Sequence, residues 1–201
     1  MNFIIIASFS IFCVVFFFAR RRVDRIEAKR DNAFWERERQ ANFTRKKPLV
    51  NLNYITIPDR LLNMEPAFTT DALNACLKTL NDLSEYRIVN LTGYTNTDLK
   101  LEYGTANITI LSDFDLHYTN LVTCLQKLAE LLHENGDDAL AVTVLEFAVS
   151  TGTDVSKSYY LLADLYDAAG AHEKIAGLID AAGELRSLLK DSIVQNLKER
   201  L

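Results

Sequence analysis

Apolar and polar residues follow a helical period along most of the chain, and the opening segment departs from it. Residues 1–19 are apolar at 16 of 19 positions and carry no charge, and Arg20, Arg21 and Arg22 follow at once. The apolar run over residues 3–19 would rise about 25 Å as a helix, which is the short end of a membrane span. We predict a transmembrane signal-anchor over residues 1–19.

The charges around this segment favour an uncleaved anchor. A cleaved secretion signal has basic residues before its apolar run and a small-residue cleavage site after it, and this chain has neither. Basic residues stay on the cytoplasmic side, so the membrane-flanking Arg20, Arg21 and Arg22 predict an outward N-terminus and a cytoplasmic domain. A bacterial plasma membrane is the default location. The alternative is an inverted or cleaved anchor, with the domain acting outside the cytoplasm as an envelope assembly factor.

Residues 20–47 form a basic juxtamembrane stem. They hold eleven Lys/Arg and five Asp/Glu, a net charge of +6, with no Gly or Pro. We predict a helix over residues 20–40, helped by near-neighbour pairs such as Glu27 with Arg30. The stem has two interpretations, attraction to anionic lipid and a solvated helix with ordinary topology signals. The second is favoured because the five acidic residues dilute the basic patch.

Residues 48–66 and 67–121 are predicted as an extended linker and an irregular N-terminal cap. Three prolines discourage helix in the linker. The cap opens with a capped amphipathic helix over 70–84, whose apolar stripe includes Cys76 as a core residue. The remaining predicted elements of the cap are a short strand at 87–91, a helix at 98–103 capped by Thr97 and ended by Gly104, an extended piece at 107–111 and a helix opened by Asp115.

A repeat of 34 residues appears in the helical region that follows. Residues 128–149 align with residues 162–183. Leu128-Ala129 matches Leu162-Ala163 and allows close helix approach, and Gly136 matches Gly170 as the turn between helices. This pattern resembles the tetratricopeptide repeat, in a degenerate form covering residues 122–187. Two departures are Ile175, where the family prefers Ala, and the absence of the family's closing Pro.

The resemblance implies a mainly α fold. It consists of an N-terminal transmembrane helix and a tetratricopeptide-like α-α superhelical domain, with a small irregular or short-strand cap at the N-terminus. About three stacked units are usually needed to bury such a core, so residues 67–121 are expected to supply the missing surface. Residues 188–201 are predicted to be a C-terminal capping helix. Its expected buried residues are Leu188, Leu189, Ile193, Val194 and Leu197.

The resemblance also implies a protein-binding surface on the first helices of the repeats. The candidate residues are Thr123, Gln126, Lys127, Glu130, His133, Lys157, Tyr160, Leu161, Asp164 and Asp167. Family members that clamp a terminal carboxylate use Lys, Arg and Asn at such places. Glu130, Asp164 and Asp167 are acidic instead, which suits a basic or mixed peptide. A solvated acidic face is equally open, and Tyr160 with Leu161 is the one hint of a structural subunit whose repeat face is buried in a membrane complex.

The sequence contains no motif that predicts an enzyme, a cofactor or a metal site. The three cysteines have no metal-ligand spacing, and His117, His133 and His172 lack a second ligand at helical spacing. Residues 48–201 carry a net charge of −11, which argues against nucleic-acid binding. We predict a single-pass membrane-anchored adaptor or scaffold whose partner is a protein or peptide, and whose lipid contact is made by residues 3–19.

Overall fold

The structure is a computed structural model that describes residues 2–200, without the side chains of residues 2 and 4–6. This described part contains nine α-helices, one 3-10 helix and two strands of two residues each, so the prediction of a mainly α fold is confirmed. The chain divides into two compact units. Unit 1 comprises Met1–Lys47 and Thr95–Ile108, and unit 2 comprises Pro48–Tyr94 and Thr109–Leu201.

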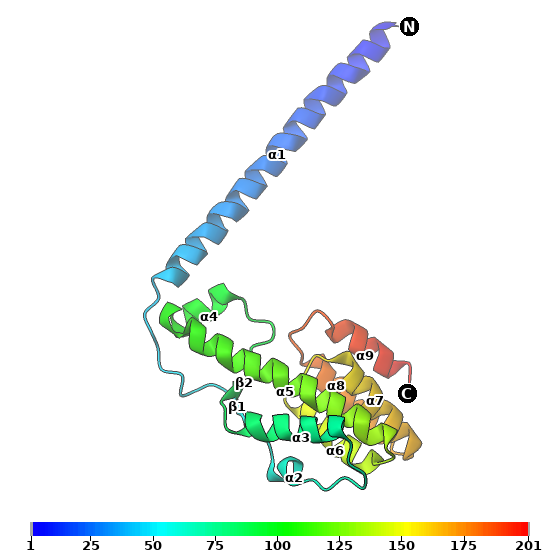
Figure 1. The fold of residues 1–201 in the computed structure, drawn as a ribbon. Helices are drawn as coiled ribbons and strands as arrows, with labels where there is room; N and C mark the ends of the chain where they lie inside the picture. Colours follow the sequence, from blue (N-terminus) through cyan, green and yellow to red (C-terminus); the bar gives the residue numbers. More distant parts are fainter. Residues whose placement is uncertain (1, 201) are drawn as a thin grey trace. The chain divides into compact units, whose positions relative to one another are not determined.

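The longest element of unit 1 is α1 (Asn2–Asn42), one continuous helix (Figure 1). It includes residues 20–40, so the helix predicted there is confirmed. Among the described residues, no helix has an apolar stretch long enough to span a membrane. The predicted anchor over residues 1–19 falls partly outside that description, because residue 1 and the side chains of residues 2 and 4–6 are not included.

The C-terminal end of α1 packs against α4 (Asn96–Tyr103) and the 3-10 helix η1 (Thr105–Asn107), an arrangement we call the clasp. Thr95, not Thr97, caps α4, because its hydroxyl accepts from the Asp98 amide while the Asp98 carboxylate accepts from the Thr95 amide. Gly104 ends α4 as predicted. The clasp brings together residues that are about sixty positions apart in the chain.

Unit 2 begins with elements inside the predicted linker. Strand β1 (Tyr54–Ile55) pairs antiparallel with β2 (Ile88–Val89), and α2 (Asp59–Leu62) follows Pro58. The linker prediction is therefore wrong in part, because Pro58 is tolerated as the residue before a helix and Leu61 is fully buried. The strand predicted at 87–91 is confirmed as β2.

Helices α3 (Asp71–Ser84) and α5 (Ile108–Glu134) lie side by side, with the Cys124 thiol donating to the Cys76 carbonyl at 3.3 Å. The helix predicted at 70–84 is confirmed, with Thr70 as its N-cap. The extended piece predicted at 107–111 is wrong, since α5 begins at Ile108 and buries Leu111 completely. Core burial outweighs the preference of the β-branched residues there for strands.

Residue Asp115 does not open a helix. It lies within α5, where its carboxylate accepts from the Leu91 amide at 3.3 Å. This contact joins α5 to the loop after β2, so Asp115 serves to position that loop.

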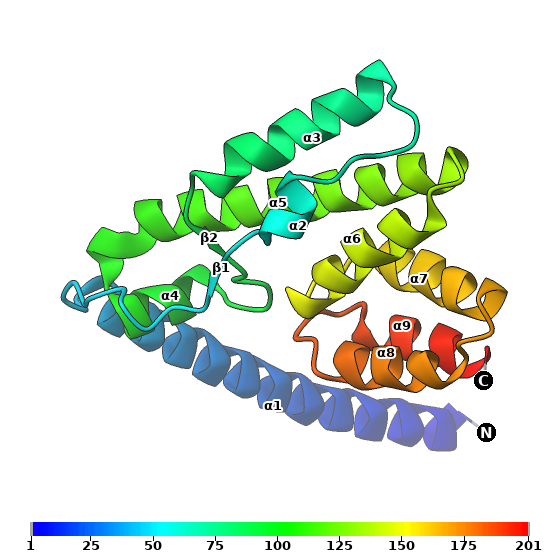
Figure 2. The same cartoon turned by 90° about the horizontal axis from the view of Figure 1, so that it is seen from below.

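Four further helices complete unit 2 and pack against one another (Figure 2). Helix α6 contacts α7, α7 contacts α8 and α9, and α8 contacts α6 and α9. Gly136 and Gly170 make the turns before α6 and α8 with φ of 83° and 70°, where glycine is favoured. The bounds of these helices are Asp138–Ser150 for α6, Ser156–Ala168 for α7, Glu173–Gly183 for α8 and Lys190–Lys198 for α9.

The last helix differs from its prediction at its start. Leu188 and Leu189 are exposed, at 102% and 47%, whereas Ile193 and Leu197 are buried as expected. The reason is that α9 begins at Lys190, so the two leucines precede the helix and its periodicity does not apply to them.

Candidate protein-binding site

A groove of about 220 Å³ lies between α5 and α7, the helices that begin the two predicted repeats. Seven of the ten predicted binding residues line it, and Glu134 is an eighth lining residue that the sequence reasoning missed. Glu134 lies eight residues after Gln126 on the same helix, so this spacing was a usable signal. The seven are Gln126, Glu130, His133, Lys157, Tyr160, Leu161 and Asp164.

A buried polar contact holds the two sides of the groove together. The Ser158 hydroxyl donates to Gln126 Oε1 at 2.6 Å, and Gln126 Nε2 donates to Glu130 Oε1 at 2.9 Å. Ser158 is fully buried and Gln126 is 8% exposed, so each group needs this partner. The contact fixes the spacing of α5 and α7 and turns the Glu130 carboxylate toward the groove.

The groove has an acidic rim. Glu130, Glu134 and Asp164 contribute carboxylates, and Lys157 is the one lysine among the lining residues, 3.9 Å from Glu130. Glu134 and Asp164 are exposed. The rim therefore carries excess negative charge toward solvent.

One rim carboxylate is held by a residue that follows the C-terminal end of α9. Arg200 pairs with Asp164, donates to the Tyr160 carbonyl at 3.2 Å and lies over the Tyr160 ring at 5.7 Å. No sequence signal links Arg200 to a residue 36 positions earlier. Asp164 is thus paired with Arg200, and Glu130 is held by Gln126 and lies near Lys157, whereas Glu134 is an exposed carboxylate of the rim.

The floor of the groove is partly apolar. Tyr160 and Leu161 are half-buried and pack against the core of unit 2, which leaves part of each side chain facing outward. A carboxylate rim beside an aromatic and an aliphatic side chain offers charge and apolar contact to the same ligand.

Three predicted residues lie outside the groove lining. Thr123 donates back to the Thr119 carbonyl at 2.8 Å, and Lys127 is exposed on α5. Asp167 is paired with His172, Oδ1 to Nδ1, at 2.8 Å. The structure gives these residues local roles in α5 and at the turn into α8.

The two predicted repeats each bring a His and an Asp close together at matching positions, with the two residue types exchanged. His133 Nδ1 and Asp138 Oδ1 are hydrogen-bonded at 2.6 Å at the turn from α5 to α6, whereas Asp167 Oδ1 and His172 Nδ1 lie 2.8 Å apart without hydrogen-bond geometry at the turn from α7 to α8. Residue 133 corresponds to 167 and residue 138 to 172 at a shift of 34. A close His–Asp approach is thus found at both turns, with the residue types reversed.

The Cys124 thiol and the buried phenol groups of the core stay protonated at neutral pH, which suits them to packing rather than to acid–base or nucleophilic catalysis. Burial raises the pKa of the Cys124 thiol and that of the Tyr118 phenol, each to about 12. Burial also raises the pKa of Tyr159 and Tyr166. Across the described residues, no three His, Cys, Asp or Glu side chains are placed to hold a metal ion. Comparisons with protein-family models, with curated proteins and with solved structures found no match to this chain.

Proposed function

We propose that the chain is a membrane-anchored, non-enzymatic adaptor that binds a basic or mixed-charge peptide segment of a protein partner in the α5–α7 groove. The observation that supports this most strongly is the acidic rim of Glu130 and Glu134 beside the half-buried Tyr160 and Leu161. A peptide with basic and apolar side chains complements both features. The exchanged His–Asp pairs, 34 residues apart, support the tetratricopeptide-like interpretation of the helices that form the groove.

The groove is tested by neutralising two of its rim carboxylates with side chains of nearly the same shape. Fluorescent peptides of graded net charge are titrated into the full chain and into a Glu130→Gln, Glu134→Gln variant. We expect basic peptides to bind the native chain and to lose about tenfold in affinity with the variant, since about 1.4 kcal/mol of attraction would be lost. Asp164 is left unchanged because it holds Arg200 and α9.

A matched control removes two carboxylates elsewhere in unit 2. Asp180 and Glu184 are exposed at the C-terminal end of α8 and do not line the groove. The Asp180→Asn, Glu184→Gln variant has the same net charge as the groove variant. Equal loss of affinity in both variants would mean that overall charge, not the groove, attracts the peptide.

We also propose that residues 3–19 anchor the chain in a membrane, with the remainder in the cytoplasm. In the described part of this segment, nine large apolar side chains are exposed, among them Phe9, Phe12 and Phe16. The sequence adds three isoleucines at residues 4–6. A long exposed apolar surface followed directly by arginines is typical of a membrane anchor with a cytoplasmic domain.

The anchor and its orientation are tested with one cysteine variant. Arg30→Cys adds an exposed thiol to a chain whose Cys76 and Cys124 are buried and whose Cys13 lies within the proposed anchor. Pelleting after an alkaline carbonate wash supports insertion, and release contradicts it. A membrane-impermeant maleimide should label the introduced thiol only after the cells are broken. Labelling of intact cells would favour the alternative of an extracytoplasmic assembly factor.

A further inference from the structure

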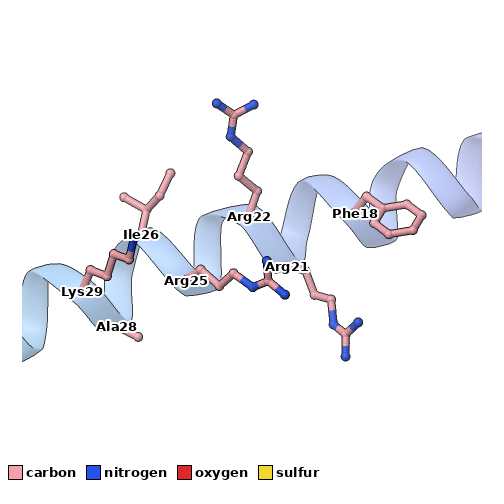
Figure 3. Close-up of a pocket in the computed structure, with 7 residues that line it drawn as sticks. All are labelled: Phe18, Arg21, Arg22, Arg25, Ile26, Ala28 and Lys29. Atoms are coloured by element: carbon pink, nitrogen blue, oxygen red, sulfur yellow. The ribbon is translucent and has the colours of Figure 1, made fainter.

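Basic residues form a cationic face on the first turns of the stem. They share this face because α1 continues through the stem as one helix. Arg21, Arg25 and Lys29 follow one another at intervals of four residues, so they lie along one side of the helix, with Arg22 beside them. These four cations and Phe18, Ile26 and Ala28 line a hollow of about 720 Å³. Figure 3 shows the side chains spreading from one stretch of helix, with Arg21 and Ala28 at one edge and Arg22 and Ile26 at the other.

The acidic residues of the same turns lie on another side of the helix. Asp24, Glu27 and Asp31 are absent from the lining of the hollow, and at about 3.6 residues per turn they point away from the line of Arg21, Arg25 and Lys29. Dilution of the patch by acidic residues, which favoured a solvated stem on sequence grounds, therefore does not apply to this face.

The four cations are also free of ion-pair partners among the described residues. Within the described residues, none of them takes part in an ion pair, and the ion pairs of α1 are made further along by Arg37, Glu38 and Arg39. Arg21 lies over the Phe17 ring at 5.1 Å, which joins the face to the end of the apolar segment. Because these four cations beyond the apolar segment make no ion pair within the described residues, they can bind an external anion.

We propose that this cationic face binds the phosphate groups of anionic lipids, an inference that rests on the proposed membrane anchor. The first cation of the face, Arg21, follows the apolar segment by two residues, and Lys29 lies about 15 Å beyond its end. That range is comparable to one or two Debye lengths at physiological salt. Guanidinium groups bind phosphate with paired hydrogen bonds, and Phe18 extends the apolar contact into the same face.

The test uses Trp35, the single tryptophan of the chain, which lies on α1 about 24 Å beyond Ala19. The full chain is reconstituted in phosphatidylcholine vesicles with a small fraction of dansyl-labelled phosphatidylserine or dansyl-labelled phosphatidylcholine. Energy transfer from Trp35 reports the local concentration of each lipid. We expect phosphatidylserine to be enriched about fivefold, a ratio that corresponds to roughly 1 kcal/mol, and the enrichment to disappear at high salt.

Two variants with equal charge separate the face from the net charge of the stem. Arg21→Gln, Arg25→Gln, Lys29→Gln should abolish the preference, whereas Arg30→Gln, Arg45→Gln, Lys46→Gln should keep it. Equal transfer to both lipids in the native chain, or equal loss in both variants, would overturn the inference. Absence of transfer to either lipid would instead show that the proposed anchor fails, so the two failures are distinguishable.

Discussion

At the scale of single residues, two carboxylates make the clasp of unit 1 sensitive to acid. Hydrogen bonds from Lys100 and Thr97 hold the pKa of Glu38 below its ordinary 4.5, and hydrogen bonds from Thr95, with Arg37 nearby, hold the pKa of Asp98 below 3.8. In the unfolded chain both carboxyl groups bind protons at higher pH than in the folded one. Their stabilisation is therefore complete above the unfolded pKa values and is lost as pH falls through the lower, folded values.

The expected outcome is a melting temperature of the clasp that falls as the pH is lowered from about 6 to about 3. Trp35 lies one helical turn before Glu38 and reports this unfolding by its fluorescence. In Glu38→Gln, the midpoint should be lower at pH 6 and should depend less on pH. An unchanged pH dependence in that variant would contradict the role given to Glu38.

Another residue of the clasp, Gly104, is required by both conformation and space. Its φ is +89°, and a Cβ there would lie 2.2 Å from the Arg45 carbonyl oxygen. Gly136→Ala is a matched control, because Gly136 has a φ of +83° but no atom within 4 Å of the added Cβ. We expect Gly104→Ala to lower the unfolding free energy by more than Gly136→Ala, which should cost about 1 kcal/mol. Equal losses in chemical denaturation would show that the close approach to Arg45 does not matter.

At the scale of elements, the exchanged His–Asp pairs give a direct test of the repeat. His133→Asp places two carboxylates at the turn into α6, and Asp138→His, added to it, recreates the order found at Asp167 and His172. We expect the single variant to lose up to about 1 kcal/mol at pH 6, as for an exposed pair, and the double variant to recover it. A double-mutant cycle of unfolding free energies measures the coupling. Absence of coupling would weaken the equivalence of the two turns.

Element boundaries show which features of the fold were readable from sequence. Helical periodicity and turn glycines predicted the helix at 70–84 and the turns at Gly136 and Gly170, because these depend on neighbours within about four residues. The piece at 107–111 was mistaken for a strand because its β-branched residues were read without the core that buries Leu111. Seven residues of the groove lining were among those that the resemblance to the tetratricopeptide repeat implied, whereas the contact of Arg200 depends on tertiary packing.

At the scale of the whole molecule, the chain leaves unit 1 at Lys47 and returns to it at Thr95. This path could not be predicted from local sequence, because the clasp joins segments about sixty residues apart. The Asn107 side chain donates to the carbonyls of Lys47 and Tyr103, each at 2.7 Å, and Ala41 is fully buried. Residues 95–108 therefore depend on the end of α1, although unit 2 surrounds them in the sequence.

This dependence predicts the behaviour of a fragment that begins at residue 48. Removing residues 1–47 deletes Glu38 and Asn42, the partners of Lys100, and one of the two acceptors of Asn107, while the internal contacts of α6, α7 and α8 are kept. We expect hydrogen exchange to show the amides of α4 unprotected in the fragment and those of α6–α8 still protected, because exchange reports the local free energy of opening. A fragment of residues 37–201, which keeps the clasp, should restore protection in α4. Loss of protection throughout the shorter fragment would mean that unit 2 needs the clasp for its own stability, and the separation into two units would then not extend to folding.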